Sequence, residues 1–162
     1  MRVRLYVAVC GSGTASADEL RTAERVGELL AVAGAVVVCG GLGGVMDAAA
    51  RGCEAAGGTS IGLLPGADRS GASPHLTVAM PTGMGEARNA LVVRAADAVI
   101  AIGGELGTLS EIALALKMDV PVIGLGTWSF GRAGLERDPV ARAGSPEEAV
   151  DLALKAARRL RS

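Results

Sequence analysis

Aromatic residues are scarce in this chain, which has one Trp, one Tyr and one Phe among 162 residues. Hydrophobic residues nevertheless make up 50% of the sequence. The core must therefore consist of Val, Ala, Leu and Ile side chains. A chain of this length suits a single domain, residues 1–162, and is long enough to bury a substantial core.

Several features of other protein classes are missing. No apolar run reaches the roughly 20 residues of a membrane span, and the N-terminus has no signal-cleavage pattern. The formal net charge is −1, so electrostatics does not favour nucleic-acid binding. One His, no CxxC pair and three Cys without metal-ligand spacing argue against a metal site. We expect a cytoplasmic protein with no membrane or nucleic-acid partner.

The three thiols are Cys10, Cys39 and Cys53, and an odd number favours reduced cysteines. Cys10 and Cys39 each end a predicted strand. We interpret them as small buried side chains, with a redox pair as the alternative.

The chain does have 24 glycines, many of them at the ends of apolar runs. Apolar strands are expected at 4–10 and 35–39. Between them, residues 16–34 show helical spacing and begin with a capping box, Ser16 followed by Glu19. This pattern predicts a strand–helix–strand unit.

The same alternation continues to the end of the chain. We expect four further helices, which begin at residue 45, span 84–95, run from the 103–107 turn to Met118, and begin at Ser145. Strands are expected at 59–65, 76–80, 98–102, 120–125 and 139–143. The segments 65–75 and 126–138 are expected to be irregular. Nearly continuous apolar strands are typical of a parallel sheet that is buried on both faces. The predicted fold class is α/β, a three-layer Rossmann-like doubly wound parallel sheet of about six or seven strands.

Ligands of such sheets bind beyond the carboxyl ends of the strands, where every glycine-rich turn of this chain is expected. Helix N-termini at this edge favour phosphate. The first turn, GSGTAS, lacks the third glycine of dinucleotide-binding folds, and no acidic residue follows Cys39, so NAD binding is disfavoured. The predicted phosphate-binding residues of these turns are Gly11, Ser12, Gly40, Gly41, Gly43, Gly44, Gly83, Gly103, Gly104, Gly107 and Thr108.

The segment Gly40–Gly44 has four glycines in five residues, more than a tight turn needs. We expect it to hold a ligand. Bulky substitution at Gly44 or Gly107 should then abolish ligand binding and leave the fold intact.

Arg88 and Glu111 each lie in the first turns of a helix that follows a predicted strand. Each has a simpler explanation, an exposed helix arginine and a glutamate that favours the helix dipole. Since both lie at the ligand edge, we expect adjacent strand ends to bring them over one crevice.

The motifs GGLGGVMDAAARG, ARN and GGELGTLSE resemble those of the Lonely-guy (LOG/SLOG) superfamily of Rossmann-like proteins, formerly mislabelled lysine decarboxylases. The resemblance extends over about residues 4–160. Its known branches include phosphoribohydrolases that release cytokinin bases from nucleoside monophosphates, and molybdenum-cofactor carrier proteins. Gly107, Thr108, Glu111 and Arg88 match the hydrolase pattern. Asn89 replaces its lysine and Glu105 replaces a glycine, so the chain looks closer to the carrier branch.

The resemblance implies that Arg88, Asn89 and Glu111 belong to the site, with Arg88 and Glu111 catalytic only in a hydrolase. The first interpretation is a carrier-like binding protein for a small phosphorylated ligand, a nucleotide or the molybdenum cofactor. The second is a nucleoside 5′-monophosphate phosphoribohydrolase that cleaves the N-glycosidic bond. The third is a scaffold with a degenerate site. No cofactor is required, and the candidate bound ligands are the molybdenum cofactor, AMP and phosphate.

Family resemblance also implies a homo-oligomer, a dimer or tetramer, which the broad apolar surface of the predicted 84–95 helix supports. The roles of two further side chains are left open between two alternatives. His75 is expected at the surface, with a place in a lid as the alternative. Trp128 is expected to pack in the core or an interface, with a position beside a ligand ring as the alternative.

Overall fold

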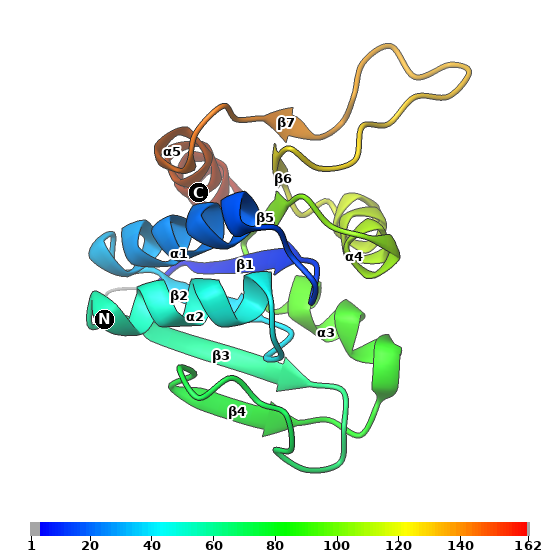
Figure 1. The fold of residues 1–162 in the computed structure, drawn as a ribbon. Helices are drawn as coiled ribbons and strands as arrows, with labels where there is room; N and C mark the ends of the chain where they lie inside the picture. Colours follow the sequence, from blue (N-terminus) through cyan, green and yellow to red (C-terminus); the bar gives the residue numbers. More distant parts are fainter. Residues whose placement is uncertain (1–3, 162) are drawn as a thin grey trace.

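A parallel sheet of seven strands with helices on both faces forms the fold (Figure 1). The structure is a computed structural model, and it describes residues 4–161. The predicted α/β doubly wound fold is confirmed. The predicted single domain of residues 1–162 includes residues 1–3 and 162, which lie outside the described part.

The elements follow the predicted alternation closely. The strands are β1 (Tyr6–Gly11), β2 (Val36–Cys39), β3 (Thr59–Leu64), β4 (Val78–Pro81), β5 (Ala98–Ile102), β6 (Val122–Leu125) and β7 (Ala141–Arg142). The helices are α1 (Ala17–Val32), α2 (Val45–Ala55), a 3₁₀ turn η1 (Gly85–Arg88), α3 (Asn89–Arg94), α4 (Leu106–Lys117) and α5 (Pro146–Leu160).

The spatial order of the strands is β4-β3-β2-β1-β5-β6-β7, and every pair is parallel. The chain thus proceeds outward from β1 to β4, then returns across the sheet and continues outward from β5 on the other side of β1. The switch in direction lies between β1 and β5. In sheets of this kind, the crevice at the switch point is the usual ligand site.

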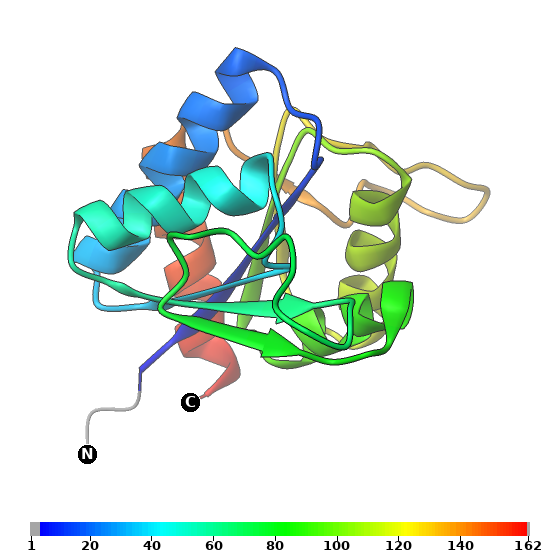
Figure 2. The ribbon, with the colours of Figure 1, turned by 60° about the horizontal axis from the view of Figure 1, so that its bottom comes forward.

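Two apolar layers cover the faces of the sheet. Val7 and Val9 of β1 face the layer of α1, α2 and α5, whereas Ala8 and Cys10 face the layer of α3 and α4 (Figure 2). Strand alternation places Cys39 on the α2 face, where its Sγ lies 4.0 Å from the Met46 carbonyl oxygen. Cys10 and Cys39 therefore lie on opposite faces, a geometry that does not suit a redox pair.

Three predicted elements differ from the observed ones. The expected helix at 84–95 is divided into the 3₁₀ turn η1 and the shorter helix α3. Gly83 and Gly85, at the start of this segment, have positive φ values of +63° and +56°. Strand β4 alternates between exposed and half-buried residues, since it is an edge strand. Strand β7 has only two residues. Before β7, residues 126–140 form a long connection that extends away from the sheet (Figure 1).

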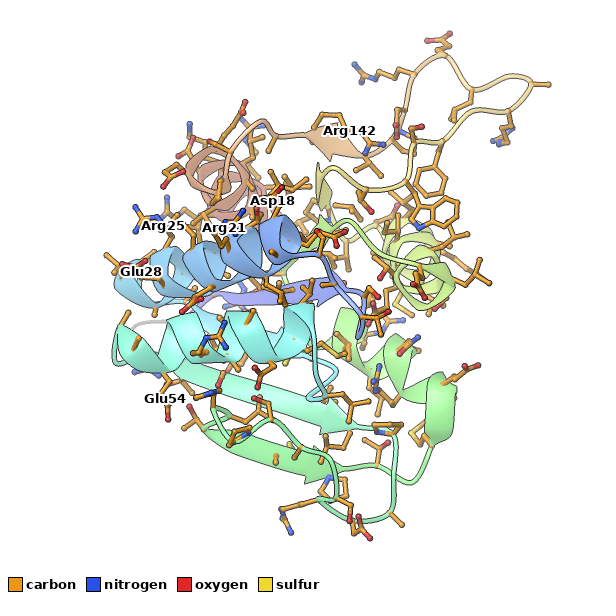
Figure 3. The ribbon with its side chains drawn as sticks, in the orientation of Figure 1. Asp18, Arg21, Arg25, Glu28, Glu54 and Arg142 are labelled. Atoms are coloured by element: carbon orange, nitrogen blue, oxygen red, sulfur yellow. The ribbon has the colours of Figure 1, made fainter. Side chains whose placement is uncertain are left out.

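Helix starts are capped as the sequence predicts. Ser16 and Glu19 form the capping box of α1, and the Ser145 side chain accepts a hydrogen bond from the Glu148 amide at the start of α5. The outer surface of α1 carries paired charges that point into solvent, among them Arg25 and Glu28 (Figure 3). Such exposed ion pairs contribute little stability.

No helix in residues 4–161 is long and apolar enough to cross a membrane. On α3, Leu91 keeps 37% of its surface exposed. An oligomer contact through this helix stays a prediction.

Close approach of α1 and α2 depends on helix glycines. A Cβ atom at Gly27 of α1 would lie 2.0 Å from the carbonyl oxygen of Ala49 in α2. We expect Gly27→Ala to lower the free energy of unfolding by roughly 1–3 kcal/mol, because the helices must move apart. Urea unfolding measures the change. In the matched control Gly107→Ala, the new Cβ meets no atom within 4 Å. This helix substitution should stabilise by up to about 1 kcal/mol, and equal effects of the two variants would contradict the prediction.

Candidate functional site

A cavity of about 340 Å³ opens where the chain changes direction, at the carboxyl ends of β1 and β5. Its lining comes from the turn after β1, the segment between β2 and α2, the end of β3, η1, and the start of α4. The lining residues are Gly11, Ser12, Gly13, Leu42, Met46, Pro65, Glu86, Arg88, Asn89, Glu105, Gly107, Thr108 and Glu111. Seven of the predicted site residues thus share one cavity.

Arg88 ends η1 and keeps only 8% of its surface exposed. Its Nη1 donates a hydrogen bond to Oδ1 of Asn89, while its buried Nε has no hydrogen-bond partner within the described chain. Gly40 provides the space for this side chain, since a Cβ there would lie 2.7 Å from Nη2 of Arg88. A buried guanidinium with an unused donor suits an anionic ligand in the cavity.

Asn89 connects the two helices on this side of the sheet. Its Nδ2 donates to Oγ of Ser110 in α4 at 3.0 Å, and this hydroxyl donates to the Gly107 carbonyl oxygen at 2.7 Å. Asn89 therefore positions Arg88 relative to the start of α4. Ser110 was not predicted as part of the site, because its contribution depends on a contact between helices.

Glu111 is 6% exposed and lies on the inner side of α4. Burial raises its pKa to about 7, although a hydrogen bond with the Cys10 thiol and attraction to Arg88 both act in the opposite direction. Burial of the Cys10 side chain, together with the nearby Glu111 carboxylate, raises the pKa of the Cys10 thiol well above its usual value. The thiol therefore stays protonated and donates its hydrogen bond to Glu111. Because α4 begins at Leu106, Glu111 is buried in the second turn of the helix, so the expectation of a first-turn glutamate was wrong.

Arg88 and Glu111 line the same cavity for a different reason from the predicted one. They follow β4 and β5, which are not adjacent, because β3, β2 and β1 lie between them. The connection through η1 and α3 runs back toward the centre of the sheet (Figure 1), and Arg88, which ends η1, lines the cavity there. Both side chains line one cavity, but the assumption of neighbouring strand ends was wrong.

The start of α4 contributes the clearest anion-binding feature of the cavity. Gly107 and Thr108 of its first turn line the cavity, and a Cβ at Gly107 would meet no atom within 4 Å. Amides in a first helical turn have no acceptor within the helix, and the helix dipole is positive there. Glu105, the N-cap residue, makes no side-chain capping bond. These amides are therefore available to an anion.

The glycines of the Gly40–Gly44 segment do not line the cavity; Leu42 does. Their main role is close packing. A Cβ at Gly44, whose φ is +64°, would lie 2.2 Å from the Ser12 carbonyl oxygen, and the Val45 amide donates to that oxygen at 3.0 Å. A bulky residue at Gly44 would therefore disturb the fold, so the expectation that the fold stays intact was wrong at this position.

Other predicted residues lie beside the cavity. Gly83, Gly103 and Gly104 are absent from its lining and have positive φ values of +63°, +51° and +100°. They shape the turns before η1 and α4. Sequence reasoning missed Glu86, Pro65 and Met46 as lining residues, although Pro65 is the last residue of a predicted strand.

His75 and Trp128 also lie outside the lining. The Nδ1 of His75 lies 2.6 Å from Oε2 of Glu54 on α2. Trp128 is 37% exposed, so it is not a core residue, and its indole donates to the Glu105 carbonyl oxygen at 3.2 Å. Within residues 4–161, no group of three or more His, Cys, Asp or Glu side chains is arranged to hold a metal ion.

The raised pKa of Glu111 makes stability depend on pH. Between its usual value of 4.5 and about 7, the unfolded chain loses this proton while the folded chain keeps it. Stability should therefore fall as pH rises from 5 to 8, by roughly 3 kcal/mol from this group. Glu111→Gln should remove the contribution of this group to the pH dependence of the free energy of unfolding. Urea unfolding at pH 5 and pH 8 measures the change. Glu105→Gln, at an exposed position, should keep it, and an unchanged pH dependence in Glu111→Gln would contradict the assignment.

Known proteins share both the sequence and the fold. An uncharacterised protein from Archaeoglobus fulgidus is 42% identical over 113 residues, which is 70% of this chain and 74% of the relative. The molybdenum cofactor binding protein of Rippkaea orientalis is 36% identical, covers 96% of this chain and 98% of its own, and superposes with a TM-score of 0.87. The Moco carrier protein of Chlamydomonas reinhardtii is 30% identical, with coverages of 97% and 99% and a TM-score of 0.84.

The resemblance seen in the sequence motifs is thereby confirmed. Residues 4–150 match the SLOG cluster4 family, and the chain belongs to that family.

Proposed function

We propose that this protein is a carrier that binds the molybdenum cofactor, a phosphorylated pterin, in the cavity beside Arg88. The likeness to two proteins described as binding or carrying this cofactor, at 36% and 30% identity, supports the proposal. The observation that carries it is the buried Arg88 guanidinium, whose Nε has no partner within the described chain and which lines the cavity.

The phosphate of the cofactor would lie at the first turn of α4. Gly107 and Thr108 offer amides there, and the Thr108 hydroxyl is a further donor. Arg88 would contribute its charge from the η1 side. A guanidinium and a helix N-terminus acting together favour a phosphate group over a neutral ligand.

The rest of the cavity suits a flat ring system. Leu42, Met46 and Pro65 form an apolar side. The cavity volume of about 340 Å³ lies near the lower end of the roughly 300–1,000 Å³ of small-molecule sites. A small ligand with one phosphate and one heterocycle matches these dimensions.

A phosphoribohydrolase acting on nucleoside monophosphates is the second candidate. It is favoured by the position of Glu111, three residues after Thr108 in the same cavity, where a carboxylate can stabilise a developing oxocarbenium ion. Two observations favour the carrier instead. Asn89, at the position of the hydrolase lysine, hydrogen-bonds Arg88 and Ser110. The raised pKa of Glu111 also reduces its negative charge at neutral pH.

Binding and turnover assays separate these functions. Calorimetry should detect binding of molybdenum cofactor released from a molybdoenzyme, while chromatography after incubation with AMP should detect no free adenine. Base release that Glu111→Gln abolishes would favour the hydrolase. Absence of binding and of turnover with the cofactor, AMP and inorganic phosphate would leave a scaffold with a degenerate site.

Arg88 should contribute directly to affinity. We expect Arg88→Ala to weaken cofactor binding by about 1.5–3 kcal/mol, which is roughly 10- to 150-fold in Kd, because a charged hydrogen bond is lost. Calorimetric titration measures this loss. Arg94→Ala provides the matched control, since Arg94 is an exposed arginine at the end of α3. Equal affinities of the two variants would contradict the role of Arg88.

Gly107 should tolerate a larger side chain without loss of the fold. We expect Gly107→Val to abolish the thermal shift caused by the ligand, because the isopropyl group would occupy the cavity. The unliganded melting temperature should change by only a few degrees, because no atom lies within 4 Å of the new Cβ. A full thermal shift in this variant would place the phosphate elsewhere.

A further inference from the structure

We propose that the cavity takes up a proton when it binds a phosphate monoester, and that the Glu111 carboxylate receives that proton. This inference rests on the proposed function, because it requires a phosphorylated ligand at the start of α4. It adds to the site role of Glu111 a proton-accepting role on ligand binding, which the family likeness does not assign.

The geometry of α4 brings the carboxylate close to the predicted phosphate position. Thr108 and Glu111 are three residues apart on one helix, and both line the cavity. Side chains at this spacing are neighbours on one helix face, with Cβ atoms about 5–6 Å apart. A phosphate at the first turn would therefore face Glu111 at short range.

Charges around this position are unbalanced. Arg88 is the sole cationic side chain in the lining that the structure describes, whereas Glu86, Glu105 and Glu111 are all acidic. The titratable groups that interact electrostatically with Glu111 are the Cys10 thiol from β1, Arg88 from η1 and, through the sheet, the Cys39 thiol from β2. Burial raises the pKa of Cys39 to about 11, so both thiols are neutral. A phosphate dianion therefore meets one cation and a buried carboxylate.

Glu111 is the carboxylate that this imbalance affects most. Glu86 and Glu105 are exposed, so water screens their charges. Glu111 is 6% exposed, and its pKa is already about 7 before any anion is present. A nearby anion raises the pKa of a carboxyl group further. Once protonated, Glu111 can donate a hydrogen bond to the ligand instead of repelling it.

A definite pH dependence follows from this linkage. Below about pH 6, Glu111 already carries its proton in the free protein, and binding needs no uptake. Above about pH 7, the proton must come from solvent, so affinity should fall by up to tenfold for each pH unit. The second ionisation of a phosphate monoester such as AMP, near pH 6, affects wild type and variant equally.

Calorimetry in buffers with different ionisation enthalpies tests the proposal, with AMP, inorganic phosphate and the molybdenum cofactor as probes. At pH 8 the wild type should take up about 0.5–1 proton per ligand, and Glu111→Gln should take up none. For AMP, the affinity of Glu111→Gln should stay nearly level between pH 7 and 9. Glu105→Gln should keep the wild-type pH slope, because its exposed carboxylate is not the receiving group.

Cys10→Ala supplies a second variant in case Glu111→Gln does not fold. Loss of the thiol hydrogen bond removes an influence that lowers the pKa of Glu111, so the fall in affinity should begin at a higher pH. Binding with the same pH slope in wild type and Glu111→Gln would overturn this inference alone. Absence of binding by all three probes between pH 5 and 9 would overturn the proposed function together with it.

Discussion

The return of the chain from β4 to β5 is the constraint on which the rest of the site depends. All strand pairs are parallel, so each connection must cross a face of the sheet. Only the connection through η1 and α3 crosses back over β3, β2 and β1. It brings Arg88 into the cavity at the carboxyl ends of β1 and β5, although β4, the strand that precedes Arg88, is separated from β1 by β3 and β2.

That return creates an unusual electrostatic environment. Arg88 and Glu111 are both more than nine-tenths buried, and no ion pair within 4 Å joins them in the part of the chain that the structure describes. Asn89 and Cys10 hold the two groups by hydrogen bonds instead. The arrangement keeps the positively charged Arg88 guanidinium and the titratable Glu111 carboxyl group facing one cavity. A ligand anion can therefore interact with both, which an internal salt bridge would prevent.

Glycines serve two different purposes around the site. Gly40 and Gly44 allow other atoms to approach, the Arg88 guanidinium in one case and the Ser12 carbonyl in the other. Gly107 faces open space and so leaves room for a ligand. A sequence pattern cannot distinguish these purposes, because both need only a missing side chain. This explains why the glycine-rich segment after β2 looked like a ligand cradle and proved to be chiefly a packing contact.

The sequence by itself determined the order of helices and strands, the parallel sheet and the sheet edge at which the candidate site lies, because apolar periodicity, helix caps and glycine turns are local signals. It also singled out Arg88, Thr108 and Glu111. Only the tertiary structure decided that β4 and β5 lie apart, that Asn89 connects α3 to α4, and that burial beside Cys10 changes the ionisation of Glu111. These features depend on contacts between residues distant in the chain, and burial alters a pKa only after those contacts have formed.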